Sequence, residues 1–173
     1  MHIIKATLDD ISFITEGYTS AQQSGAVTKQ TPLRPFLEHH LKVSNRLVLP
    51  RAAPHPFIED SPFAKPLDDI FVLQSDNKNA GLFWLRNFDD AHLAPITFAE
   101  FLLFWVHPDY RGRGLWPTVD AFVRQWTTEA NKTLLMGRCL KPSRRMAELF
   151  NRSGYKLEGT SPSGMTVHSW KPN

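Results

Sequence analysis

The sequence predicts a mixed α+β fold in a single domain, and three observations support this. The chain has 173 residues, 42% of them hydrophobic, which is enough to bury one sizeable core. Strand-like apolar segments recur along it, and the longest runs from about 97 to 106. A loop rich in Arg and Gly and then an amphipathic helix follow that segment. We therefore expect one domain over residues 1–173.

The first 43 residues predict one strand and two helices. A short strand should cover Ile3 to Ala6, and Asp9 should then cap a helix. That helix would turn four side chains inward: Ile11, Phe13, Ile14 and Tyr18. A second helix is expected from about Pro32 to Val43. Its neighbouring His39 and His40 would point about 100° apart, so we expect no metal site there.

Residues 47–69 predict an irregular insertion into the domain. Five prolines interrupt any regular element in this stretch: Pro50, Pro54, Pro56, Pro62 and Pro66. Long loops in compact domains are often functional, and Phe57, His55 and Glu59 suit a ligand pocket. A surface loop without substrate contacts is an equal alternative.

Strand patterns dominate after the insertion. Ile70 to Gln74 and Leu82 to Arg86 flank a polar turn and predict a hairpin. The long strand of residues 97–106 follows. The rest of the chain predicts a strand at Thr133–Arg138, a helix at Ser143–Ser153, and strands near Lys156–Gly159 and Met165–Trp170. Gly154 is well placed to end that last helix.

The loop after the long strand has the features of an anion-binding loop. Gly112 and Gly114 lack the Cβ atoms that would hinder close approach, and the next helix directs its positive end at the same place. A dinucleotide-binding loop would need a third glycine and a later acidic residue, and this sequence fits that pattern poorly. A P-loop would need Lys and then Ser or Thr, whereas Leu115 and Trp116 follow Gly114.

This loop resembles the acyl-CoA loop of the GNAT superfamily of N-acetyltransferases, in which Arg or Gln is followed by two residues, Gly, one residue, and Gly or Ala. Arg111, Gly114 and Trp116 occupy these places. Residues 149–155 are similar to the family's second signature, Leu-Tyr-x-x-x-Gly-Phe. The resemblance covers about residues 98–160. It implies a mostly antiparallel, twisted sheet of about six to seven strands, flanked by helices and splayed around the acyl-CoA site.

The resemblance also implies which residues contact acetyl-CoA. These are Trp105, Val106, Arg111, Gly112, Arg113, Gly114, Leu115, Trp116, Ser143 and Phe150. Three of them depart from the family pattern, because Trp116 replaces a small residue, Ser143 an asparagine, and Phe150 a tyrosine that donates a proton. The group that donates a proton to the departing thiolate is therefore left open among Tyr155, His107, Tyr110 and solvent.

Glu100 is the candidate general base. Residues 98–101, Phe-Ala-Glu-Phe, resemble the start of the corresponding strand in the family's histone acetyltransferases. Glu100 precedes Val106 by six residues, so a regular strand would put both on one face. The alternative is a solvated Glu100 without a role. Cys139 is expected to be a buried hydrophobe and not an acyl carrier, while Trp84 and Trp105 could line an acceptor cavity.

Charge divides the chain into two unequal halves. Residues 1–100 contain nine Lys or Arg and twelve Asp or Glu, a net charge of −3, whereas residues 101–173 contain eleven and five, a net charge of +6. Six basic residues could attract the phosphates of the cofactor: Arg111, Arg113, Arg138, Lys141, Arg144 and Arg145. Solvated surface charges are the alternative. The acidic first half favours a cationic acceptor and argues against nucleic acid.

A single cysteine and the lack of a signal peptide or an apolar run of about 18 residues predict a cytoplasmic protein that neither binds nor crosses a membrane. We expect acetyl transfer from acetyl-CoA, without a metal, to a primary amine of a small molecule or of a protein or peptide. The alternative is a catalytically weak or inactive CoA-binding or regulatory module. The sequence leaves a monomer and a homodimer open.

Overall fold

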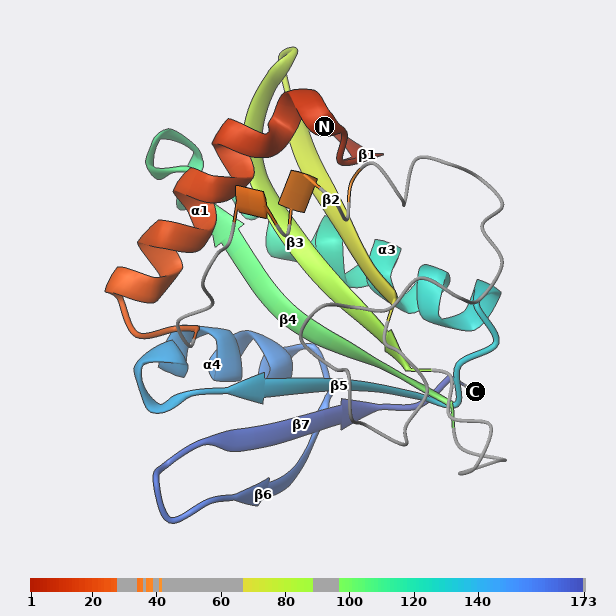
Figure 1. The fold of residues 1–173 in the computed structure, drawn as a ribbon. Helices are drawn as coiled ribbons and strands as arrows, with labels where there is room; N and C mark the ends of the chain where they lie inside the picture. Colours follow the sequence, from red (N-terminus) through yellow and green to blue (C-terminus); the bar gives the residue numbers. More distant parts are fainter. Residues whose placement is uncertain (28–33, 36, 39–40, 42–66, 89–96, 173) are drawn as a thin grey trace.

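The computed structural model describes residues 1–27, 34–35, 37–38, 41, 67–88 and 97–172 (Figure 1). Its strands form one sheet in the order β1-β2-β3-β4-β5-β7-β6. Every neighbouring pair is antiparallel except β4 and β5, which are parallel. The predicted α+β class with a mostly antiparallel sheet is therefore confirmed. Among the described residues, no helix has the length and apolarity to cross a membrane.

The elements have the following bounds. The strands are β1 (His2–Lys5), β2 (Leu67–Ser75), β3 (Lys78–Phe88), β4 (Phe98–Val106), β5 (Leu134–Cys139), β6 (Lys156–Thr160) and β7 (Thr166–Trp170). The α-helices are α1 (Ile11–Gln23), α3 (Trp116–Glu129) and α4 (Arg144–Arg152). Short 3-10 helices are η1 (Leu8–Asp10), η2 (Pro108–Tyr110) and η3 (Lys141–Ser143). Residues 34–35, 37–38 and 41, inside the predicted second helix, are also helical.

Asp10 and not Asp9 occupies the position before α1, so the prediction that Asp9 caps this helix is wrong. The Asp10 carboxylate makes no capping hydrogen bond to α1 and bonds to Thr7 instead. The main-chain N–H of Thr7 donates to Asp10 Oδ2 at 2.9 Å and so starts η1, which runs into α1. Asn79 Nδ2 donates to the other carboxylate oxygen at 3.1 Å. The buried Asp10 thus fixes the start of α1 against the β2–β3 hairpin, a long-range contact that local capping patterns do not contain.

The predicted hairpin is confirmed, with a two-residue turn between Ser75 and Lys78. Asp76 and Asn77 have φ angles of +52° and +59°, the left-handed region that such turns require and that Asp and Asn tolerate. The insertion predicted for 47–69 extends too far, because β2 already begins at Leu67. Residues 47–66 lie outside the described part of the chain.

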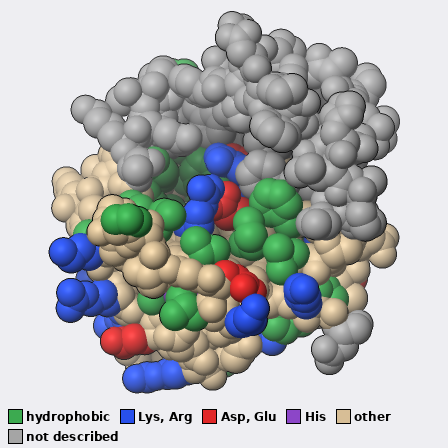
Figure 2. Space-filling model, turned by 90° about the horizontal axis from the view of Figure 1, so that it is seen from below, with side chains coloured by type: hydrophobic (Ala, Val, Ile, Leu, Met, Phe, Trp, Pro, Cys, Tyr) green, Lys and Arg blue, Asp and Glu red, His purple; other side chains and the backbone are tan. Residues whose placement is uncertain are grey.

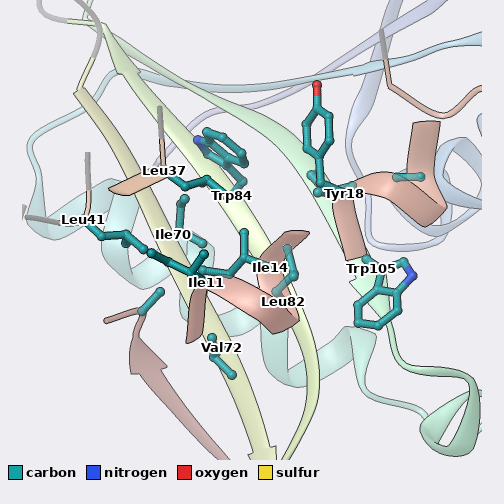
Figure 3. Packing of buried hydrophobic residues seen from close by; sticks show 13 residues of the cluster. Ile11, Ile14, Tyr18, Leu37, Leu41, Ile70, Val72, Leu82, Trp84 and Trp105 are labelled. Carbon is teal, nitrogen blue, oxygen red and sulfur yellow. The ribbon is translucent and has the colours of Figure 1, made fainter. Parts of the chain in front are cut away.

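Two apolar cores cover the two faces of the sheet. On one face α1 packs against β2, β3 and β4, and Leu37 and Leu41 join this core (Figure 3). On the other face α3 and α4 pack around Val119, Val123 and Phe150. Trp105 belongs to the first core and Phe101 to the second, so β4 lies between the cores with both faces covered.

A β-bulge in β4 changes which way Glu100 faces. Trp84 pairs with Leu103, and Leu85 pairs with Phe101, so Leu102 is an extra residue in β4. The bulge reverses the alternation of side chains, since one inserted residue shifts the strand by one place. Glu100 therefore shares the α1 face with its pairing partner Arg86, whereas Val106 faces α3. The prediction that Glu100 and Val106 lie on one face is wrong for this reason.

The strands β4 and β5 separate partway along their length. Their pairing runs from Phe98 with Leu134 to Phe101 with Gly137, and then it ends. Each strand nevertheless continues, β4 to Val106 and β5 to Cys139. The sheet is thus open at this point, as the sequence resemblance implies.

We expect Gly137→Ala to destabilise the fold, because a Cβ at this position would overlap the ring of Phe150. Overpacking of this kind costs about 1–3 kcal/mol of the free energy of unfolding. Urea denaturation measures the loss. Gly159→Ala is the matched control, since its Cβ would meet nothing within 4 Å. Equal stability of the two variants would contradict a tight contact between Gly137 and Phe150.

Candidate functional site

A cavity of about 560 Å³ occupies the opening between β4 and β5. One wall is β4 from Phe101 to Val106, a second is the segment Tyr110 to Trp116, and a third is formed by β5 and α4. All ten residues that the sequence predicts as cofactor contacts line this one cavity. The segment that follows α1 contributes Ser24, Ala26 and Val27, for which the sequence offers no signal.

Backbone conformation explains the two loop glycines. Gly112 and Gly114 have φ angles of +78° and +69°, which side chains disfavour. A Cβ at either place would meet nothing within 4 Å, so conformation and not crowding within the chain requires glycine. Arg111 Nε donates to the carbonyl oxygen of Val106 at 3.2 Å and ties the loop to the end of β4.

Positive charge lines the cavity. Four of the six basic residues singled out from the sequence contribute to its walls: Arg111, Arg113, Arg138 and Arg145. Lys141 and Arg144 do not. The guanidinium of Arg113 lies over the ring of Tyr110, 4.8 Å from its centroid. Guanidinium groups together with turned backbone N–H groups form the environment that phosphate oxygens prefer.

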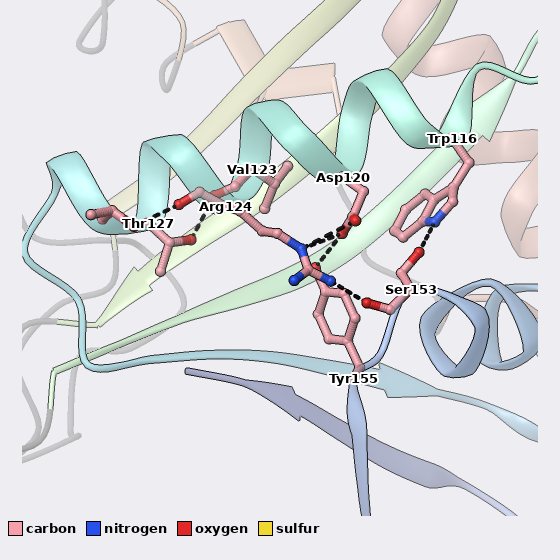
Figure 4. Close-up of polar contacts among 8 residues, drawn as sticks. Trp116, Asp120, Val123, Arg124, Thr127, Ser153 and Tyr155 are labelled. Atoms are coloured by element: carbon pink, nitrogen blue, oxygen red, sulfur yellow. Dashed lines mark hydrogen bonds and ion pairs between the residues drawn. The ribbon is translucent and has the colours of Figure 1, made fainter. Parts of the chain in front are cut away.

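Trp116 points into the protein and not across the loop (Figure 4). Its side chain is buried, with 7% of the residue exposed. The indole Nε1 donates to Ser153 Oγ at 2.7 Å, and the ring packs against Phe104 and Phe150, each with its centroid 5.6 Å away. The indole thus connects the start of α3 to the end of α4 and leaves the glycines uncovered.

Tyr155 has a structural role, in which it bonds to α3, and it does not line the cavity. Its hydroxyl donates to Asp120 Oδ1 at 2.9 Å, and Arg124 holds the same carboxylate with Nε at 3.1 Å (Figure 4). Arg124 also donates to the main-chain oxygen of Ser153. Burial, together with the negative charge of Asp120, raises the pKa of Tyr155 far above its usual range. Of the donors that the sequence left open, Tyr110 lines the cavity and Tyr155 does not.

Cys139 lines the cavity but is a buried thiol. Burial raises its pKa to about 11, although a hydrogen bond with Thr166 lowers it in part. The thiolate is the nucleophilic form of cysteine, so burial disfavours Cys139 as a nucleophile. The structure thus agrees with the sequence interpretation of a small apolar residue.

A second cavity of about 300 Å³ adjoins the first and contains Glu100. The two cavities share five lining residues: Ala26, Val27, Leu102, Leu103 and Arg138. Glu100 is buried, with 3% of its side chain exposed, and it accepts a hydrogen bond from Arg138 Nε. It does not lie at the solvated start of the strand. The bulge at Leu102 brings Glu100 to this side, together with Trp84 and Arg86.

Figure 2 shows the molecule from below. Basic and acidic side chains lie side by side in a hollow near its centre, with hydrophobic side chains around them.

Sequence reasoning assigned Arg138 to phosphate binding and missed its contact with Glu100. The alternation of β5 contained a usable signal, because Gly137 and Cys139 face α4, so that Arg138 must face the other side.

Comparisons with known proteins identify the fold. No family model matches the chain, and no curated protein matches its sequence. Among solved structures, it resembles a GNAT-family acetyltransferase from Listeria monocytogenes, with a TM-score of 0.64 and 12% identity over 99% of this chain and 94% of the other. It also resembles yncA from Salmonella typhimurium, solved with acetyl-CoA, with a TM-score of 0.71 and 14% identity over 100% and 94%.

A third similar structure is spermidine N-acetyltransferase from Vibrio cholerae in complex with CoA and spermine. Its TM-score is 0.65 and its identity 15%, over 97% of this chain and 92% of that one. These likenesses show that the chain has the GNAT fold, as the sequence resemblance predicts.

We expect the stability of the protein to fall when the pH is lowered from about 7.5 to about 5.5, in part because of His168. Burial lowers the pKa of His168, whose Nε2 lies 3.0 Å from Thr166 Oγ1. In the unfolded chain His168 binds a proton near pH 6.5, and in the folded chain it does so only at lower pH. The contribution of His168 to stability is therefore present above about pH 6.5 and is lost as the pH falls below it. Urea denaturation across this range measures the slope. An unchanged slope in His168→Gln would contradict the assignment.

Proposed function

We propose that this protein is an acetyl-CoA-dependent N-acetyltransferase that acts on a primary amine. The observation behind this proposal is the opening between β4 and β5, which ends at a glycine loop and is lined by arginines. The GNAT fold, shared with proteins solved with acetyl-CoA and with CoA and spermine, supports it. When bound, acetyl-CoA supplies an acetyl group activated as a thioester.

The residues of the opening fit this co-substrate. The positive φ angles of Gly112 and Gly114 let backbone N–H groups turn around the diphosphate, with Arg111, Arg113 and Arg145 nearby. Beyond Phe101 none of the described strands pairs with the β5 side of β4. We assign the pantetheine arm to the main-chain groups of β4 that face this side, among them the N–H of Val106.

Deprotonation of the amine is assigned to Glu100. An ammonium group has no lone pair, so the acceptor must lose a proton before it attacks. Glu100 lines the second cavity, and its Oε1 accepts from Nε of Arg138, which lines both cavities. The other oxygen, Oε2, is assigned to the acceptor. Tyr110 is assigned to protonation of the departing thiolate, since it lines the first cavity.

A CoA-binding module without turnover is the second candidate. Phe150 stands where the family commonly has a tyrosine, and its buried ring has no proton to donate. The neighbouring phenol of Tyr155 is occupied by Asp120. Such a module would bind acetyl-CoA and release no CoA with any amine.

Calorimetry with acetyl-CoA, followed by thiol release over a panel of primary amines, tests the proposal. We expect saturable binding and release of CoA that depends on the amine. Gly114→Val should weaken binding at least about tenfold, because a β-branched side chain disfavours the left-handed φ that the loop uses. Undiminished binding by this variant would contradict a role of the loop, and binding without release would favour the module.

We expect Glu100→Gln to lower kcat at neutral pH by about 10²-fold or more, the usual contribution of a general base. Glutamine keeps the shape of the side chain and can still accept from Arg138, so the affinity for acetyl-CoA should change little. Glu148→Gln, at an exposed position on α4, is the matched control. An unaltered pH–rate profile in Glu100→Gln would remove Glu100 from the reaction.

A further inference from the structure

Arg138 stands at the junction of the two cavities and lines both. Half of its side chain is exposed, whereas its partner Glu100 is 3% exposed. The Nε edge of the guanidinium donates to Glu100 Oε1. Within the described part of the chain, no hydrogen bond reaches its two Nη nitrogens. The outer edge of this guanidinium is therefore available to a ligand.

Arg86, the other guanidinium of the second cavity, is engaged differently. Its Nε donates to Asp68 Oδ1 at 2.9 Å and its Nη2 to Oδ2 at 3.3 Å. This bidentate pair uses the forked edge that would otherwise bind a carboxylate. Among the described residues of the second cavity, Arg138 is thus the cation that remains for an anionic ligand.

The remaining described walls of the second cavity are mostly apolar or aromatic. They are Tyr18, Ala26, Val27, Trp84, Leu102, Leu103, Leu140 and Met165. A ligand that fills this space with a hydrocarbon group gains from burial. Its charges must then meet the two ionic groups at the junction, since unpaired charges are costly to bury.

We propose that the acceptor is an amino carboxylate, namely a free α-amino acid with an apolar side chain. This inference rests on the proposed acetyl transfer. The Glu100–Arg138 pair presents a negative and a positive group next to each other. An α-amino acid matches both, with its amine at Glu100 Oε2 and its carboxylate on the two Nη groups of Arg138. A polyamine would instead place a second cation beside Arg138.

The reaction balances with this acceptor. The amine loses a proton to Glu100, its nitrogen forms a bond with the acetyl carbon, and the bond between carbon and sulfur breaks. The thiolate takes up a proton from Tyr110, the nitrogen loses its second proton to the resulting tyrosinate, and Glu100 releases the first proton to solvent. The products are an N-acetyl amino acid and CoA. The carboxylate remains unchanged and contributes only to binding and orientation.

A matched set of acceptors tests the role of the carboxylate. L-Leucine, L-leucinamide and 3-methylbutylamine share one hydrocarbon group, and spermidine serves as the polyamine; the corresponding sets for methionine and phenylalanine extend the panel. For at least one set we expect kcat/KM to be at least about tenfold higher for the amino acid, as for a hydrogen bond to a charged group. The amide has the less basic amine, so ease of deprotonation alone would favour the amide.

Variants of Arg138 connect any preference to this residue. Arg138→Gln should bring the ratio of kcat/KM between amino acid and amine close to one, mainly through a higher KM for the amino acid. Arg138→Lys keeps the charge but loses the fork, so the ratio should fall only in part. Arg152→Gln, at an exposed position on α4 outside both cavities, is the control. An unchanged ratio in Arg138→Gln would overturn the inference.

The outcomes separate this inference from the proposed function. If the protein does not bind acetyl-CoA, both fail. If it acetylates spermidine or the amines as well as it does the amino acids, acetyl transfer stands and the amino carboxylate is wrong. If it binds acetyl-CoA without turnover, calorimetry of the CoA complex with each of the three amino acids shows whether the second cavity binds an amino carboxylate. Absence of binding there overturns the inference as well.

Discussion

The end of the hydrogen-bonded pairing between β4 and β5 is the constraint on which the site depends. Parallel strands normally continue to pair along their shared length, but here pairing stops at Phe101 and Gly137. Gly137 leaves room for the ring of Phe150, which packs against Phe101 and Trp116. Aromatic packing on the α4 side therefore stabilises the place where the strands part, and the larger cavity lies in the opening.

The bulge at Leu102 connects this opening to the charges on the other face. Without the extra residue, Glu100 would point toward α3 and into the second core. With it, the carboxylate faces α1 and meets Arg138 across the end of the paired region. The glycine loop and the arginines lie on one side of the site, and the ion pair lies on the other. In the proposed reaction the first part would bind phosphate and the second part the acceptor.

Much of the fold follows from local patterns in the sequence. Neighbouring residues determine the alternation in β2 and β3, the Asp76–Asn77 turn and the strand–loop–helix order around Gly112. The failures concern contacts between distant residues. The hydrogen bond between Asp10 and Asn79 joins residues 69 positions apart. The direction of Glu100 depends on an inserted residue that shows only when β3 and β4 are paired. The pairing of Glu100 with Arg138 joins residues 38 positions apart, which spacing does not reveal.

The most direct measurement is a crystal structure of the protein grown with saturating acetyl-CoA. Our interpretation predicts the pantetheine arm between β4 and β5, the diphosphate on main-chain N–H groups of residues 111–116, and the acetyl group near Glu100 and Arg138. Ligand bound at another surface, or an opening that stays empty although the ligand is saturating, would contradict it.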